Sequence, residues 1–264
     1  KKYIPEMKAA AAGGEAESIL YLPLSTKNGD IGVITVQSFN KNAYNSYHLE
    51  ILKNLAVYIG IAIENAEAYK DIGDFSSRLE KANQKFTSSI NYAKRIQEAI
   101  LPRIETIRQY LPESFVLFRP RDIVSGDFYW FAEQHSRIFI AVVDCTGHGV
   151  PGAFMSMIGN DLLNEVIVNV GIEEPDYILS EMHMGIRNAL KQEATDNRDG
   201  MDMSICVIDK IAQRIDYAGA KSPLVYIKNG EMVVVKPTAM SVGGKQHKSY
   251  RNYKKHSIST TDID

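Results

Sequence analysis

An apolar repeat in the middle of the chain constrains the fold more strongly than any other sequence feature. Between residues 72 and 100, side chains that are apolar with one exception recur at alternating steps of three and four residues, with charged or polar residues around them. This heptad pattern predicts a long helix with a narrow apolar seam, which favours pairing with a partner helix. We expect a parallel homodimer, and the alternative is a helix that packs on its own domain. The seam consists of Ile72, Phe75, Leu79, Ala82, Phe86, Ser89, Ala93, Ile96 and Ile100.

The segment before the seam has the pattern strand, turn, strand, helix. Short apolar, β-branched runs at residues 19–24 and 31–38 predict two strands, and Asn28-Gly29-Asp30 between them is a turn signal. Asn45 or Ser46 is suited to cap a helix over about residues 48–71. Gly73 interrupts the helical pattern only weakly.

The segment after the seam predicts a different kind of domain. Pro102 and Pro112 bracket a short helix, and Asn229-Gly230 is a hairpin signal. Two longer helices are expected at about residues 151–170 and 175–194. Because the strands do not alternate regularly with helices, we expect an α+β fold in which antiparallel sheet packs against helices. The predicted strands are 115–118, 127–131, 138–143, 203–208, 214–218, 224–228 and 232–236.

Composition excludes several classes of protein. The chain has 264 residues and a net charge of −2, without a basic cluster, so we expect no nucleic-acid partner. No run reaches the roughly 18 apolar residues of a membrane span, so we expect no membrane partner. The two cysteines, Cys145 and Cys206, lack the spacing of a zinc site and are too few for a disulfide framework. A cytoplasmic location fits best.

Three aspartates stand beside glycines at the ends of predicted strands. Asp127 lies in S-G-D-F-Y-W, Asp144 in V-V-D-C-T-G-H-G and Asp202 in D-G-M-D-M-S. Any one of them alone would usually be a turn or capping residue. If they converge, their charges repel unless a cation neutralises them, and carboxylate oxygens suit Mg²⁺ or Mn²⁺ better than Zn²⁺. Two such ions can activate water and clamp a phosphoryl group.

The loop after Asp144 holds two further candidates. His148 suits a general acid or an oriented structural histidine, whereas a zinc ligand would need a second His or Cys at ligand spacing. Cys145 as a nucleophile lacks the usual His and Asn partners. Pro151 fits the first turn of the next helix. We expect the apolar positions of this helix to be core: Phe154, Met155, Ile158, Leu162, Leu163 and Val166.

Four ordered motifs together resemble one enzyme family. They are similar to the SpoIIE branch of the metal-dependent protein phosphatases, which are distant relatives of protein phosphatase 2C. The motifs are S-G-D-F-Y-W-F, V-V-D-C-T-G-H-G-V-P-G-A-F-M-S, G-M-D-M-S-I-C-V-I-D and Y-A-G-A-K-S-P-L-V-Y. The resemblance covers about residue 115 to the C-terminus. It implies two antiparallel sheets sandwiched between helices, and hydrolysis of phosphoserine or phosphothreonine on a protein with two Mn²⁺ or Mg²⁺ ions.

The same resemblance implies a role for each site residue. Asp144 would bridge the two metals, with a bridging water as nucleophile. The main-chain carbonyl of Cys145 would bind one metal. Asp127 would hold the same metal directly or through water, and Asp202 would hold the other. Arg121 is a candidate for steering the phosphate, and His148 for the catalytic set. A further metal-binding Asp-Gly motif is expected beyond Asp264, since Asp262 and Asp264 lack this context and resemble turn residues. We therefore expect the phosphatase part, residues 113–264, to be C-terminally incomplete.

The N-terminal part resembles the last third of a GAF sensory domain. The similarity lies in P-L-S-T-K-N-G-D, I-G-V-I-T-V-Q-S and L-E-I-L-K-N-L-A-V-Y-I-G-I-A-I-E-N-A. Residues 1–71 would belong to this domain, and residues 72–112 resemble a signalling coiled coil. The expected function is a sensor-controlled protein phosphatase that acts on a phosphorylated regulatory protein. Two alternatives are an inactive scaffold that keeps the fold, and a sensor that mainly dimerises and binds a ligand. The three intact aspartates favour the enzyme.

Overall fold

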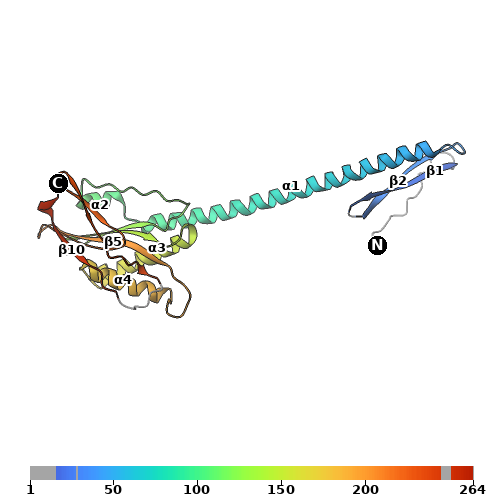
Figure 1. The fold of residues 1–264 in the computed structure, drawn as a ribbon. Helices are drawn as coiled ribbons and strands as arrows, with labels where there is room; N and C mark the ends of the chain where they lie inside the picture. Colours follow the sequence, from blue (N-terminus) through green and yellow to red (C-terminus); the bar gives the residue numbers. More distant parts are fainter. Residues whose placement is uncertain (1–15, 28, 245–250, 264) are drawn as a thin grey trace. The chain divides into compact units, whose positions relative to one another are not determined.

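A computed structural model describes residues 16–27, 29–244 and 251–263, which divide into two compact units, residues 1–84 and 85–264 (Figure 1). Helix α1 (Ser46–Ile100) contributes residues to both units. Gly73 lies inside it without ending it, since one glycine costs a helix only about 1 kcal/mol. None of the described helices combines the length and apolar composition that a membrane span needs.

The first unit contains a β-hairpin and the start of α1. Strands β1 (Ser18–Thr26) and β2 (Gly29–Ser38) pair antiparallel, as the sequence predicts. Asn45 is the helix cap: its Oδ1 accepts a hydrogen bond from the His48 N–H, and its own N–H donates to His48 Nδ1. This reciprocal pair satisfies donors at the helix start. Asn28 of the predicted turn lies outside the described residues.

The second unit is built on an antiparallel sheet. Its strand order is β10-β6-β5-β4-β3, and β9 also pairs with β5. A separate hairpin joins β7 (Leu224–Lys228) to β8 (Glu231–Val235). Its turn residues Asn229 and Gly230 have φ of 53° and 76°, the positive values of a type I′ turn. The strands of the large sheet are β3 (Phe128–Gln134), β4 (Arg137–Cys145), β5 (Gly200–Asp209), β6 (Arg214–Ala220), β9 (Val242–Gly243) and β10 (Lys255–Ser259).

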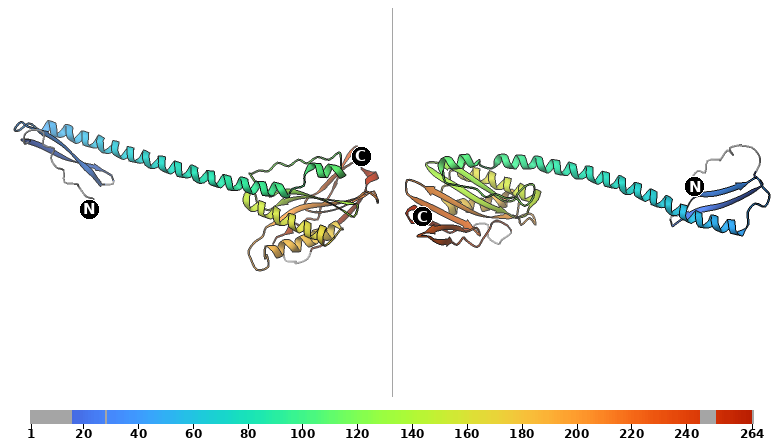
Figure 2. Two further views of the ribbon diagram at one scale, coloured as in Figure 1. Left: turned by 180° about the vertical axis from the view of Figure 1, so that it is seen from behind. Right: turned by 90° about the horizontal axis from the view of Figure 1, so that it is seen from above.

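The two longer helices cover one face of this sheet, which confirms the α+β class. Helix α3 (Gly149–Leu163) contacts β3 and β4, and α4 (Pro175–Ala189) contacts β5 and β6 (Figure 2). A π-helix, η1 (Asn164–Asn169), continues α3, and α2 (Ile104–Tyr110) is the short helix expected between the prolines. Met155 and Leu163 of α3 are buried in the core as predicted. Phe154 is not, because it lies on the outer side of α3 with 64% of its surface exposed.

One predicted strand is absent. Residues 115–118 form no ladder with any described strand, although their sequence is apolar. Phe115 and Leu117 are 82% and 78% exposed. A strand requires hydrogen bonds from a neighbour, and local β-propensity does not supply them. At the C-terminal side, Thr260–Asp262 forms a short 3₁₀ turn, η2, and Asp264 lies outside the described residues.

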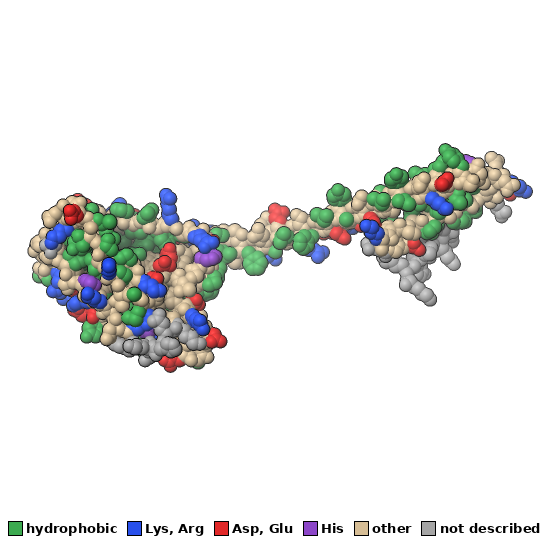
Figure 3. Space-filling view, in the orientation of Figure 1, with side chains coloured by type: hydrophobic (Ala, Val, Ile, Leu, Met, Phe, Trp, Pro, Cys, Tyr) green, Lys and Arg blue, Asp and Glu red, His purple; other side chains and the backbone are tan. Residues whose placement is uncertain are grey.

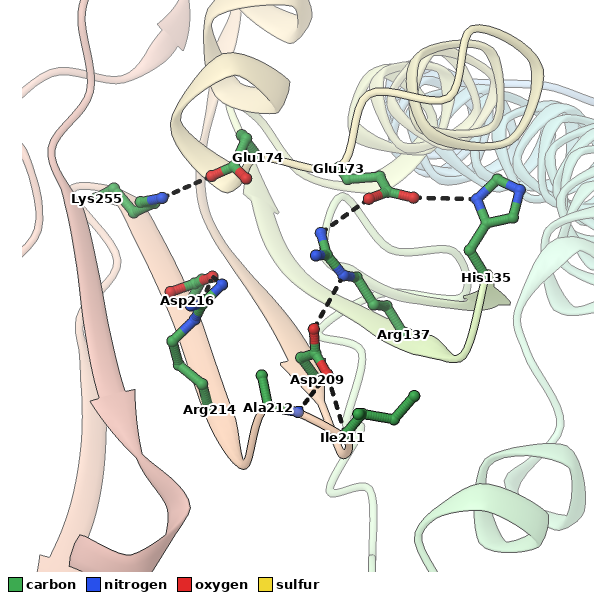
Figure 4. A network of polar contacts seen from close by, with 10 residues as sticks. All are labelled: His135, Arg137, Glu173, Glu174, Asp209, Ile211, Ala212, Arg214, Asp216 and Lys255. Carbon is green, nitrogen blue, oxygen red and sulfur yellow. Dashed lines mark hydrogen bonds and ion pairs between the residues drawn. The ribbon is translucent and has the colours of Figure 1, made fainter.

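A network of ion pairs and hydrogen bonds lies at one end of the sheet, and the three aspartates lie at the other end (Figure 4). Arg137 of β4 pairs with Glu173 at 2.8 Å and with Asp209 of β5 at 3.2 Å. The Asp209 carboxylate also accepts the backbone N–H groups of Ala212 and Ile211. The pKa of Asp209 is therefore held below its ordinary value. The largest cause is the hydrogen bond from the Ala212 N–H, and the Arg137 charge and the Ile211 N–H add to it. The network thus stabilises ionised Asp209 and the β5–β6 turn.

Candidate functional site

The three predicted aspartates lie at one end of three adjacent strands. Asp144 of β4 is directly opposite Asp202 of β5. Phe128 of β3 is opposite Val143, so Asp127, one residue earlier, comes beside Asp144. Neighbouring strands are only about 4.8 Å apart, so these side chains are near one another.

Strand alternation puts all three carboxylates on the same face. Along β4, Ala141, Val143 and Cys145 are buried toward the helices, whereas Val142 and Asp144 are exposed on the other face. The same two-residue period in β3 and β5 buries the neighbours of Asp127 and Asp202 and leaves the aspartates on the face of Asp144. The folded sheet therefore groups acidic groups that are far apart in the sequence.

Two of these carboxyl groups are close enough to affect each other's ionisation. The pKa of Asp144 is raised, first by burial, then by the charge of Asp127 and the hydrogen bond to it, and then by the charge of Asp202. Ionisation of both carboxyl groups is therefore unfavourable, and a bound cation would offset that cost.

Asp202 has a cationic neighbour that sequence inspection did not identify. Lys221 Nζ lies 3.9 Å from Asp202 Oδ1. The backbone of Lys221 forms an isolated bridge with Met203, and its N–H donates to the Thr238 carbonyl. Lys221 follows β6 directly with a φ of 57°. Lys221 also lies at the end of a strand, in Y-A-G-A-K-S-P, but it has no glycine next to it and so lacks the signal that identified the aspartates.

The donor atoms suit a hard divalent cation at Asp127 and Asp144. Their carboxylates lie at adjacent strand ends, repel each other and are exposed at the edge of a cavity. Over residues 16–27, 29–244 and 251–263, no three His, Cys, Asp or Glu side chains gather closely enough to hold a metal ion. Within the described chain the structure therefore groups two aspartates tightly, with Asp202 alongside and paired with Lys221.

The loop after Asp144 is held by close backbone packing. Gly147 and Gly149 have φ of 88° and 63°, values that residues with a side chain rarely adopt. A Cβ atom on Gly126 would lie 2.7 Å from the Gly147 carbonyl oxygen and 3.4 Å from that of Cys145. The Cys145 carbonyl is thus close to the residue that precedes Asp127. The Cys145 thiol is buried in the core. Burial raises the pKa of this thiol far above its ordinary value, which argues against a nucleophilic role.

His148 is oriented by a residue that the sequence did not single out. Its Nδ1 lies 2.9 Å from Asp122 Oδ2. Asp122 is adjacent to Arg121, the candidate phosphate-steering residue, which is exposed. Arg119 lines the cavity beside the aspartates, whereas Arg121 does not.

A cavity of about 560 Å³ opens next to Asp127 and Asp144. Its walls are mostly apolar and come from β3, β4 and the segment that was expected to be a strand. Lining residues include Leu117, Arg119, Tyr129, Val142 and Ser222.

Two family models match the chain. The model for stage II sporulation protein E (SpoIIE) matches residues 134–259, an interval that includes Asp144 and Asp202 but not Asp127. A GAF domain model matches residues 3–64.

Comparison with solved structures agrees with the first match. The SiaA-PP2C domain of Pseudomonas aeruginosa is 35% identical, with 67% of this chain and 68% of that chain covered and a TM-score of 0.59. The phosphatase domain of SpoIIE from Bacillus subtilis, a PP2C domain, is 20% identical over 52% of this chain and 38% of that chain. Its TM-score of 0.40 is too low to support an inference.

Among curated proteins, the formate hydrogenlyase transcriptional activators of Escherichia coli K12 and Salmonella typhimurium are 25% identical over 101 residues. That similarity covers 38% of this chain. It spans only 15% of the length of those relatives.

Proposed function

We propose that this chain uses divalent cations to dephosphorylate a regulatory protein. The chain belongs to the SpoIIE family of PP2C-like serine/threonine phosphatases, and it carries part of a GAF domain before the phosphatase part. The observation that carries the proposal is the placement of Asp127, Asp144 and Asp202 on one face of the sheet at adjacent strand ends. Like charges placed together at the edge of a cavity are costly for stability, and bound cations would offset that cost.

We assign the first cation to Asp127, Asp144 and the Cys145 carbonyl, and the second to Asp144 and Asp202. When bound, Mn²⁺ or Mg²⁺ would supply an activated water and positive charge for the phosphoryl oxygens. The chain's own residues would bind the cations and orient the substrate. We propose that His148, held by Asp122, gives a proton to the departing hydroxyl oxygen of the phosphorylated residue. Arg119, which lines the cavity, would add positive charge there, and Arg121 is exposed two residues later in the same segment.

The scaffold interpretation is less well supported than the enzyme. A protein that had lost catalysis would not need three carboxylates on one sheet face, and the raised pKa of Asp144 reflects their cost. We propose that the GAF part controls the phosphatase through α1 and that the protein works as a homodimer.

The metal dependence can be tested directly on the whole chain. We expect Mn²⁺ to start hydrolysis of p-nitrophenyl phosphate and chelation by EDTA to stop it. Because a ligand bound only to the folded state stabilises it, Mn²⁺ at 100 times its Kd should raise the free energy of unfolding by about 2.7 kcal/mol. Thermal unfolding with and without Mn²⁺ measures this. An unchanged melting temperature at millimolar Mn²⁺ would contradict the proposed metal site.

The homodimer is supported by the exposure of the seam. Within the described chain, Phe75, Leu79 and Phe86 leave 60% or more of their surface in water, and hydrophobic side chains are visible along the helix (Figure 3). Ala93 and Ile100 are instead partly buried in the second unit, so the last turns follow the alternative of packing on the chain's own domain. A second copy of α1 would cover the exposed part.

We expect Phe86→Glu to weaken the dimer at least about tenfold, since burying a phenylalanine contributes roughly 1.5–3 kcal/mol per chain. Analytical ultracentrifugation across a concentration series measures the dissociation constant. Lys81→Glu, an exposed change outside the seam on the same helix, is the matched control. If the unsubstituted chain sediments as a monomer at all concentrations, the homodimer is wrong.

A further inference from the structure

A lysine stands next in the row of strand ends that carries the three aspartates. In the β5–β6 ladder, Ser204 is opposite Gly219. Asp202 is two residues before the first and Lys221 two residues after the second, so both come to the same end of the sheet. Asp144 is opposite Asp202 on its other side. The ends of four adjacent strands, β3 to β6, therefore present three carboxyl groups followed by one ammonium group.

The ammonium group of Lys221 lies at the proposed cation site. Its Nζ is 3.9 Å from Asp202 Oδ1, and about half of the lysine side chain is exposed. Asp202 is one strand spacing, about 4.8 Å, from Asp144. Ser222, the residue after Lys221, lines the same cavity as Asp144. A phosphoryl group bound over these aspartates would thus be within reach of the lysine side chain.

The backbone of Lys221 is fixed at this place. Its N–H donates to the Thr238 carbonyl at 2.8 Å, and the Thr238 N–H donates to the Gly219 carbonyl at 2.8 Å. Its φ of 57° lies in the left-handed region, which a residue with a long side chain adopts only where its surroundings hold it there. Ala220 before it is buried, whereas Lys221 itself is exposed. The fold therefore presents this side chain to the site from a fixed anchor.

The charges of the row suit a phosphate group. An exposed ion pair contributes little to stability, so the ammonium group leaves Asp202 at little cost. A divalent cation at Asp202 would repel the ammonium group, while the backbone of Lys221 keeps it close. Two divalent cations outweigh three carboxylates by one positive charge, and Lys221 adds a second. This matches a phosphate monoester, whose charge near neutral pH is about −1.5 to −2.

We propose that Lys221 is a substrate-binding residue, which pairs with Asp202 in the metal-free protein and with a phosphoryl oxygen of the substrate once the cations are bound. The proposal rests on the proposed function. It deepens that function by naming the chain's own cation for the phosphate group, a role for which the sequence suggests Arg121. A lysine binds phosphate as a point charge through charge-assisted hydrogen bonds.

The test compares Lys221→Met with the unsubstituted full chain in two isothermal titrations. Titration of metal-free protein with Mn²⁺ reports the cation site, and titration of Mn²⁺-loaded protein with inorganic phosphate reports the phosphate contact. In Lys221→Met we expect the Mn²⁺ Kd to be no higher than in the parent, because no ammonium group competes for Asp202. The phosphate Kd should rise at least about tenfold, because charge-assisted hydrogen bonds are lost.

Two further substitutions and a control sharpen this test. Lys221→Arg keeps the positive charge, so we expect it to retain most of the phosphate affinity. Lys221→Asn removes the charge and suits a positive φ, so it replaces Lys221→Met if the latter fails to fold. Lys210→Gln is the matched control, because Lys210 is exposed and follows the other end of β5, where its Nζ donates to the Tyr110 carbonyl. We expect it to change neither Kd.

The two titrations separate the role of Lys221 from the proposed function. A folded Lys221→Met or Lys221→Asn protein with the parental phosphate Kd would overturn the role of the lysine alone. A higher Mn²⁺ Kd in these variants would overturn it too, because a residue that only supports the structure of the site weakens the binding of both ligands. If the unsubstituted chain binds no Mn²⁺, the proposed function is wrong, and this role of Lys221 fails with it.

Discussion

Asp144→Asn is expected to abolish phosphate hydrolysis and, at the same time, to raise the melting temperature of the metal-free protein. The loss should be about a thousandfold or more, because a bound cation contributes several kcal/mol to the transition state and Asp144 is the residue assigned to both cations. The higher melting temperature follows from the raised pKa of Asp144, which is caused first by burial and then by Asp127 and Asp202.

The sign of the stability change can be worked out from that pKa. A carboxyl whose pKa is higher in the folded state binds its proton more tightly there than in the unfolded chain. Its stabilising contribution is therefore present below the ordinary aspartate pKa of 3.8 and is lost as the pH rises through the raised value. At neutral pH ionised Asp144 destabilises the metal-free fold, and a neutral asparagine removes that cost.

Asp209→Asn provides a control of opposite sign. Asp209 lies at the other end of the β4–β5 pair, and its pKa is lowered, first by the Ala212 N–H. Its ionised form thus stabilises the protein above the ordinary aspartate pKa, and we expect its replacement to lower the melting temperature without changing hydrolysis. Melting curves at neutral pH without metal, together with kcat at saturating Mn²⁺, measure both variants. An Asp144→Asn protein that is active, or less stable than the parent without metal, would contradict the assignment.

Much of the fold was predictable because its signals are local. Asn45 as a cap and Asn229-Gly230 as a hairpin turn depend on residues close in sequence, and both predictions are confirmed. The predicted strand at residues 115–118 was wrong because a strand depends on a partner, which propensity does not report. Gly73 shows the reverse case, in which a local breaker is outweighed by the length of the helix.

The site was predictable to the extent that each aspartate follows the same local pattern. An aspartate at a strand end next to glycine can be found without knowing the sheet order. The residues that contact the site cannot be found in this way, because they come from distant segments. Asp122 contacts His148, Lys221 contacts Asp202, and Gln97 contacts the backbone of Ser125, two residues before Asp127. These contacts arise only when the strands are paired and the helices packed, and no residue pattern in the sequence announces them.

Gly126→Ala should damage the site although it adds only one methyl group. The added Cβ would lie 2.7 Å from the Gly147 oxygen and 3.4 Å from the Gly152 Cα. Both are backbone atoms, so no flexible side chain can move aside, and the loop carrying Asp127 must shift instead. A shift of about 1 Å at a catalytic group costs on the order of 100-fold in rate, and overpacking costs roughly 1–3 kcal/mol in stability.

Gly73→Ala is the matched control, because it adds the same methyl group where no atom lies within 4 Å. In the exposed interior of α1 this change should stabilise the protein by roughly 0.5–1 kcal/mol and leave hydrolysis unchanged. Denaturant unfolding and Mn²⁺-dependent hydrolysis of p-nitrophenyl phosphate compare the two variants. The close approach of the Gly126 and Gly147 backbones is required for activity only if Gly126→Ala loses hydrolysis well beyond its loss of stability. A Gly126→Ala protein with parental kcat and Mn²⁺ affinity would show that the two loops are not held together at the site.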